Sequence, residues 1–165
     1  MPGQESTGAR DDPDDPGFDA PATEPLRAGP ALVRVSSAIS DIYDQVSSHH
    51  GLTRQQSRML FVLNRRPTNM LGLGAELNLV KSTMTGVVAR MEDAGWVRRS
   101  VDPRDRRNAM LTLTAEGAEL ASRFEHEMGR RMLEVIAPLD GDDRALLGSL
   151  LSRVIMRIEE LLPPE

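Results

Sequence analysis

Apolar residues recur at helical spacing towards both ends of the chain, on either side of a shorter central region. In residues 31–50 they follow one another at steps of three and four, at Leu32, Val35, Ile39, Ile42 and Val46. A second series lies near the end, at Leu147, Leu150, Leu151, Val154, Ile158 and Leu161. Each series forms an apolar stripe along one face of a long helix. The region between them is too small to bury both stripes, so we expect one to pack against a second subunit.

The central region contains helix signals followed by a hairpin signal. Gly51 ends the first helix, and Thr53 with Gln56 forms a capping box for a second helix that stops at Pro67. Residues 70–77 and 81–94 are two further predicted helices, separated by a turn at Asn78. Two short runs, 96–101 and 108–113, flank a charged turn that contains a proline, and they predict a β-hairpin.

Two more N-cap residues complete the expected architecture. Thr114 precedes a fifth helix that ends before Pro138, and Asp140 precedes a sixth. A helix, a short helix, a tight turn, a helix and a hairpin, in this order, are typical of a winged helix-turn-helix. We therefore expect a mainly α (α+β) fold with about six helices and a two- to three-stranded wing.

The charge of the chain is distributed unevenly. The formal net charge is −5, and residues 1–30, with seven acidic and two basic residues, account for all of it. Residues 51–111 hold eleven basic and five acidic residues, a net charge of +6, whereas 31–50 and 112–165 together carry −6. A basic centre of this kind indicates a polyanionic partner such as double-stranded DNA.

Residues 1–30 have the composition of a disordered segment. They hold six of the eleven prolines and, after Met1, only Phe18 and Leu26 as large apolar side chains. Such a segment buries too little surface to offset its chain entropy. We expect an acidic, Pro-rich disordered tail over 1–30 and a single domain over 31–165. Two roles stay open for the tail: an inert linker, or a competitor of DNA for the basic centre.

Several classes of function lack the residues that they need. The chain has no cysteine, which excludes a disulfide scaffold, a thiolate zinc site and a thiol redox sensor. No GxSxG, P-loop, HExxH or dinucleotide-binding motif occurs, so we expect neither an enzyme nor a cofactor. Neither a signal peptide nor an apolar run of membrane-spanning length is present, and we expect a soluble, cytoplasmic protein without a membrane partner.

Small polar and basic residues mark the expected DNA contacts. On helix 81–94 the face opposite the apolar residues begins with short donors that suit phosphates and base edges in the major groove. The candidates on this helix are Lys81, Ser82, Thr83, Thr85, Gly86 and Arg90. Guanidinium groups on a projecting hairpin turn suit the minor groove. The arginines of the hairpin are Arg98, Arg99, Arg104, Arg106 and Arg107.

The stretch from Leu52 to Gly117 resembles the MarR family of bacterial transcriptional regulators. The motifs that carry the resemblance are Leu77-Asn78-Leu79, Lys81-Ser82-Thr83-Met84-Thr85, Met91-Glu92-Asp93-Ala94-Gly95-Trp96-Val97, Asp102-Pro103-Arg104-Asp105-Arg106-Arg107 and Leu113-Thr114-Ala115-Glu116-Gly117. The resemblance implies a winged helix lobe, here 53–113, and dimerisation helices, here 31–50 and 114–165. It further implies a homodimer on a palindromic promoter site, often released by a small molecule.

The resemblance also assigns roles within the wing and shows two departures. Asp105 and Arg107 occupy positions whose side chains pair, which leaves Arg106 to reach the minor groove. Where the family usually has Ser or Thr before the recognition helix, this chain has Val80, which cannot accept a backbone N–H. Ser82 or Thr83 can substitute, or the helix starts one residue later. Gly86 replaces a long polar side chain, so we expect few base contacts from the helix centre.

An effector pocket and a metal site are the least defined features. By resemblance, the pocket lies near Tyr43, His50 and Met59, and the first two offer polar groups. His49 and His50, with His126, are the only metal-ligand candidates, but adjacent residues of a helix point about 100° apart. We therefore predict no metal site.

These observations favour a sequence-specific transcriptional regulator, a repressor that binds its site as a homodimer and is released by a small-molecule effector. The alternative is a winged helix module for protein interaction or assembly with reduced DNA specificity, which Val80 and Gly86 support. A flat response to DNA in a binding assay would favour that alternative.

Overall fold

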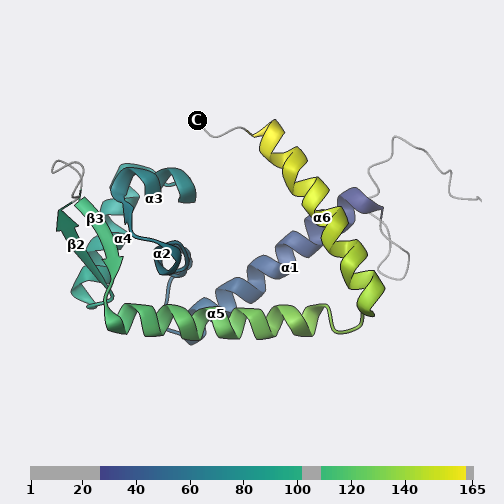
Figure 1. Cartoon of the computed structure of the whole chain (residues 1–165), viewed down its shortest axis with the longest axis horizontal. Coiled ribbons are helices and arrows are strands. Elements are labelled where there is room, and N and C mark those ends of the chain that lie inside the picture. Colours follow the sequence, from purple (N-terminus) through teal and green to yellow (C-terminus); the bar gives the residue numbers. More distant parts are fainter. Residues whose placement is uncertain (1–26, 102–108, 163–165) are drawn as a thin grey trace, which may run out of the picture. The chain divides into compact units, whose positions relative to one another are not determined.

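A computed structural model describes residues 27–101 and 109–162 of the chain (Figure 1). Its helices are α1 (Ala28–His49), α2 (Arg54–Arg65), α3 (Met70–Leu77), α4 (Lys81–Asp93), α5 (Ala115–Val135) and α6 (Gly141–Leu161). Its strands are β1 (Thr68–Asn69), β2 (Val97–Val101) and β3 (Ala109–Leu113). The prediction of a mainly α fold with a small wing is confirmed. None of the described helices is both long and apolar enough to cross a membrane.

The chain divides into two compact units, Met1–Asp41 and Ile42–Glu165. The described part of the first unit is residues 27–41, most of which belong to α1. This helix begins at Ala28, three residues before the expected domain boundary, with Pro30 in its first turn. Proline is tolerated there because the N–H that it lacks has no partner within the helix. The apolar side chains of Leu32, Val35 and Ile39 are exposed.

The second unit contains a three-stranded antiparallel sheet with the strand order β1-β3-β2. Thr68 of β1 pairs with Leu111 of β3, and Arg99 of β2 pairs with the same residue from the other side. The short β1, which follows Pro67, is the strand that the sequence pattern did not identify. Two residues are too few to show the alternation on which strand prediction depends.

The core of this unit is formed by the end of α1, by α2, α3, α4 and α5, and by the sheet. Its largest fully buried apolar side chains are Met59, Leu60, Leu73, Met84, Met91, Leu111, Phe124, Val46 and Val88. Three of them are methionines, whose flexible side chains fill irregular gaps in a core. Burial of this cluster holds α4 against α2 and α3 and fixes which of its faces points outwards.

The helix ends follow the signals in the sequence. Thr53 and Gln56 form the predicted capping box at the start of α2. Asn78, with φ 51°, and Gly51, with φ 68°, adopt the left-handed conformation expected after a helix. Thr114 and Asp140 accept backbone hydrogen bonds from Gly117 and Asp143 at the starts of α5 and α6.

The long C-terminal helix α6 exposes its apolar residues. None of its residues is buried in the single chain. Its exposed large apolar side chains are Leu146, Leu150, Leu151, Ile155, Met156, Ile158 and Leu161. An apolar face of this length is unusual on a monomer in water.

The start of α5 packs directly against the backbone that connects α4 to β2. The Thr114 hydroxyl donates to the Gly95 carbonyl oxygen at 2.6 Å, and the Thr114 N–H donates to the Trp96 carbonyl oxygen at 3.0 Å. A Cβ atom on Gly117 would lie 1.9 Å from that same Trp96 oxygen. The contact therefore requires glycine at residue 117.

Replacing Gly117 with alanine should destabilise the fold, because backbone atoms on both sides of the contact must move apart. We expect Gly117→Ala to lower the free energy of unfolding in urea by about 1–3 kcal/mol. Gly129→Ala, on the same helix with open space around it, is the matched control and should be neutral or stabilising by up to about 1 kcal/mol. Equal stabilities of the two variants would contradict the close contact.

Candidate nucleic-acid interface

Helix α4 has one buried face and one exposed face. Met84, Val87, Val88 and Met91 are at most 3% exposed and point into the core. The predicted DNA-contacting residues Lys81, Ser82, Thr83, Thr85 and Arg90 are all exposed, and Gly86 is partly exposed. The structure thus brings the predicted helix residues together on one outward surface, which we call the α4 face.

The first turn of α4 has no side-chain cap. Val80 is the N-cap residue, its side chain is 69% exposed, and no side chain accepts a hydrogen bond at this cap. The helix still starts at Lys81, so neither Ser82 nor Thr83 takes over as N-cap. The first backbone N–H groups are therefore available to an external acceptor such as a phosphate oxygen.

Arg90 reaches back over Gly86 on the α4 face. Its Nη1 atom lies 3.8 Å from the position that a Cβ on Gly86 would occupy. The absence of a side chain at residue 86 thus leaves room for a long cationic group beside the helix centre. Sequence reasoning treated Gly86 as a lost contact, but it did not foresee that a residue one turn later fills part of this space.

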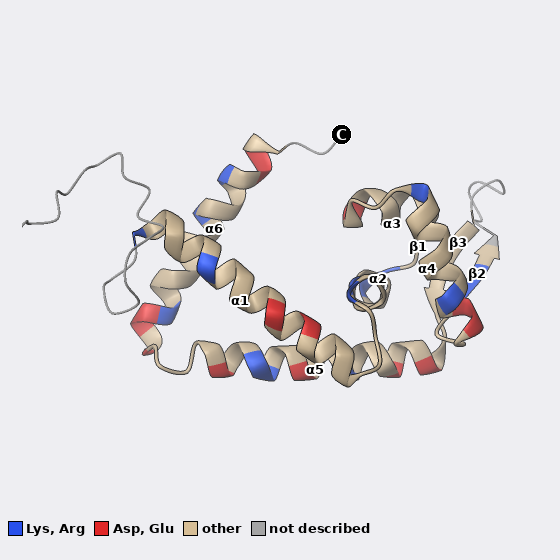
Figure 2. Ribbon diagram, turned by 180° about the vertical axis from the view of Figure 1, so that it is seen from behind, with Lys and Arg blue, Asp and Glu red and all other residues tan. Residues whose placement is uncertain are grey.

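The two arginines of β2 are held by different partners. The Arg99 Nε donates to a Glu92 carboxylate oxygen at 3.0 Å, which links the strand to the end of α4. The Arg98 Nε donates to the Thr112 hydroxyl on the paired strand at 3.1 Å. Both arginines are exposed, and Figure 2 shows basic residues in blue on α4 and β2, with acidic residues in red at the end of α4. Arg99 therefore positions the strand, whereas no described carboxylate pairs with Arg98.

The tip of the wing lies outside the described residues. It comprises residues 102–108 and includes Arg104, Asp105, Arg106 and Arg107. The pairing of Asp105 with Arg107 and the reach of Arg106 remain predictions.

The predicted effector-pocket residues separate into different environments. Tyr43 lines two cavities, one of about 420 Å³ with Phe61, Phe124 and Met128, the other of about 330 Å³ with Arg58, Glu76 and Leu77. Burial raises the pKa of the Tyr43 hydroxyl, so this group is protonated at neutral pH and can donate a hydrogen bond.

His50 and Met59 line neither of these two cavities. The His50 ring packs edge-on against Phe124 at 6.1 Å between centroids, on a part of the core next to Tyr43. Met59 has no exposed surface and belongs to the core. Of the three predicted residues, Tyr43 therefore lies in the walls of these two cavities, whereas His50 and Met59 do not.

Comparisons with known proteins agree with the fold and the motifs. A sequence profile described as the MarR family matches residues 50–108. The HTH-type transcriptional regulator PecS of Dickeya dadantii is 31% identical over 138 residues, which cover 79% of this chain and 81% of PecS. The chain belongs to the MarR family. The chain is also similar to the homoprotocatechuate degradative operon repressor of Escherichia coli, with 26% identity over 126 residues, which cover 76% of this chain and 85% of that repressor.

Two solved structures share the fold of this chain. The apo form of wild-type MarR from E. coli superposes with a TM-score of 0.68 at 23% identity, over 79% of this chain and 98% of MarR. NadR in complex with 4-hydroxyphenylacetate superposes with a TM-score of 0.64 at 22% identity, over 93% of this chain and 97% of NadR. These two likenesses confirm the winged helix architecture.

A cap introduced at the start of α4 should stabilise the protein. Serine at residue 80 can accept an N–H of the first turn, which valine cannot do, so we expect Val80→Ser to raise the free energy of unfolding by about 1 kcal/mol. Val80→Ala removes the exposed apolar side chain without adding an acceptor and is the matched control. If the two variants unfold at the same urea concentration, the claim that the first turn of α4 lacks a side-chain cap is contradicted.

Proposed function

We propose that this MarR family protein is a homodimeric repressor that binds a palindromic promoter site and is released by a small-molecule effector. The observation that carries the proposal is the α4 face. Lys81 and Arg90 lie on it, no acidic residue precedes Glu92 in the helix, and no described carboxylate pairs with either cation. A surface of this composition is complementary to DNA phosphates.

The DNA contacts follow from how α4 is held. Its apolar face is fixed in the core, so the α4 face can enter the major groove with Lys81, Ser82, Thr83, Thr85, Gly86 and Arg90. Because Thr85 donates its own hydroxyl proton to the Lys81 carbonyl oxygen at 2.9 Å, it serves DNA as an acceptor. The wing residues Arg98, Arg104, Arg106 and Arg107 contact the adjacent minor groove. Asp105 holds Arg107, and Arg99 orients β2 through Glu92.

The dimer is proposed from the exposed apolar faces of the terminal helices. The domain then comprises a DNA-binding lobe over 53–113 and dimerisation helices over 31–50 and 114–165. Both α1 and α6 expose rows of Leu, Val and Ile side chains that a second copy of the chain can cover. A two-fold dimer places its two recognition helices in successive major grooves about 34 Å apart.

The effector site is proposed at the cavities beside Tyr43. Their walls are mainly apolar and aromatic, with the Tyr43 hydroxyl and the Arg58 guanidinium as polar groups. Sites of this kind suit a small molecule with an apolar or aromatic body and a polar group. NadR, a fold neighbour, is known with 4-hydroxyphenylacetate bound. We further propose that the protein works in the cytoplasm, where a regulator of this kind meets its DNA.

The alternative role, a protein-interaction module with reduced DNA specificity, rests on the uncapped Val80 and on Gly86. The position of Arg90 over Gly86 weighs against this role. It places a positive charge at the centre of the α4 face, and such a charge favours a polyanion such as DNA as the partner.

DNase I footprinting on the DNA upstream of the protein's own gene tests the proposal. We expect protection of two half-sites related by two-fold symmetry, with centres about one helical turn apart. Protection should weaken when a cognate effector is added. Absence of a discrete protected segment at every concentration below the range of non-specific binding would contradict the proposal and favour the interaction module.

A substitution in α6 shows whether DNA binding requires the dimer as well as a folded subunit. Ile155 is 54% exposed in the single chain, so Ile155→Arg should leave the subunit folded and yet prevent dimerisation. We expect a monomer in analytical ultracentrifugation and loss of the footprint. Arg157→Ala, on the same helix at an exposed ion pair with Glu160, is the matched control and should stay dimeric.

A further inference from the structure

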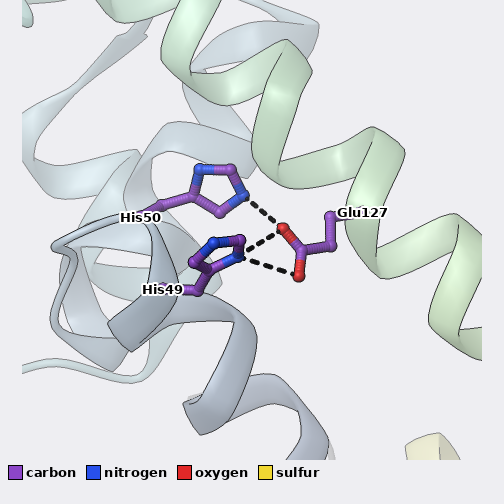
Figure 3. A group of neighbouring side chains, drawn as sticks. All are labelled: His49, His50 and Glu127. Carbon is purple, nitrogen blue, oxygen red and sulfur yellow. Dashed lines mark hydrogen bonds and ion pairs between the residues drawn. The ribbon is translucent and has the colours of Figure 1, made fainter.

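Two histidines and a carboxylate meet where the end of α1 lies against α5 (Figure 3). The His50 Nε2 lies 2.9 Å from the Glu127 Oε2. The His49 Nδ1 lies 2.9 Å from the same oxygen and 3.1 Å from Oε1. One potential ligand atom from each of the three residues lies within 4.8 Å of the others.

His49 and His50 do not point apart as two adjacent residues inside a helix would. Helix α1 ends at His49, and His50 stands in the turn that leads to Gly51. Backbone hydrogen bonds from His50 to the Val46 carbonyl and from Leu52 to the Ser47 carbonyl fix this turn. The two rings consequently face the same carboxylate, with centroids 5.3 Å apart.

Glu127 comes from α5, 77 residues further along the chain than His50, which is why the sequence pattern did not reveal it. Its carboxylate lies within hydrogen-bond distance of a ring nitrogen of both histidines.

We propose that His49, His50 and Glu127 form a binding site for a divalent transition-metal ion. The ion is Zn²⁺, because Zn²⁺ prefers imidazole nitrogen and carboxylate oxygen as ligands. In a tetrahedral zinc site with bonds of about 2.0–2.2 Å, neighbouring ligand atoms lie about 3.3–3.6 Å apart. The three ligand atoms reach this spacing through shifts of about 1.5 Å or less. The inference does not depend on the proposed function.

The surroundings of the three residues suit such a site. The His50 side chain is 14% exposed and its ring is held edge-on by Phe124, so this ligand is oriented before the metal binds. The His49 side chain is 70% exposed and lines, with Glu127, an open cavity of about 590 Å³. Solvent can reach the metal through this cavity and supply the fourth ligand.

Charges near the cavity do not repel the ion strongly. The cations on its wall are Arg123 and Arg130, and each forms an ion pair with a glutamate one turn away on α5, Glu119 and Glu134 respectively. His126 lines the same cavity, but it is exposed and does not belong to the cluster of His49, His50 and Glu127. We therefore do not expect His126 to bind the metal.

Titration of the tag-free full-length chain with ZnCl₂ in a calorimeter tests the site, with Co²⁺ absorption as a second readout. We expect one Zn²⁺ per chain and a tetrahedral Co²⁺ spectrum that Zn²⁺ abolishes. Glu127→Gln keeps an oxygen that accepts from the histidines but removes the charge, and it should weaken Zn²⁺ binding by at least about tenfold. The exposed His49 gives a second variant, His49→Ala, with the same expected loss.

His126→Ala is the matched control, because it removes an imidazole from the same cavity wall. We expect its Zn²⁺ affinity to stay within about twofold of that of the unmodified chain. Circular dichroism of each variant verifies that it is folded. The proposal is overturned if the unmodified chain takes up no Zn²⁺, or if Glu127→Gln and His126→Ala bind it equally well.

Discussion

The orientation of the proposed DNA-binding surface depends on the burial of one face of α4. Met84, Val88 and Met91 are at most 1% exposed, which fixes the rotation of the helix about its own axis. Turning the opposite face inwards would bury Lys81 and Arg90 without partners, at a cost of several kcal/mol for each charge. The same core that stabilises the lobe therefore orients the surface that we propose for DNA. In this way the fold and the function share one set of apolar residues.

Features with a local cause could be predicted from the sequence. The six helices, the capping residues Thr53, Thr114 and Asp140, and the left-handed Asn78 all depend on residues within one or two turns of each other. The division of α4 into two faces follows from its apolar spacing alone. The exposed stripes on α1 and α6 followed in the same way.

Features that join distant parts of the chain could not be predicted. Glu127 reaches His49 and His50 across more than seventy residues, and Gly117 meets the Trp96 backbone across twenty-one positions. The sequence contains no periodic signal for such contacts. Local geometry can also mislead, since Gly86 reads as a missing side chain until the position of Arg90 one turn later is known.

The salt dependence of DNA binding tests the role of the α4 face most directly. Fluorescence anisotropy on the protected fragment, repeated between 50 and 200 mM salt, gives the slope of log K against log salt concentration. Lys81→Ala combined with Arg90→Ala removes two cations per subunit and should reduce this slope by about 2 to 4. Arg123→Ala, which removes an exposed arginine from α5, should leave the slope unchanged. Equal slopes for the double variant and the unmodified protein would contradict the claim that this face binds DNA.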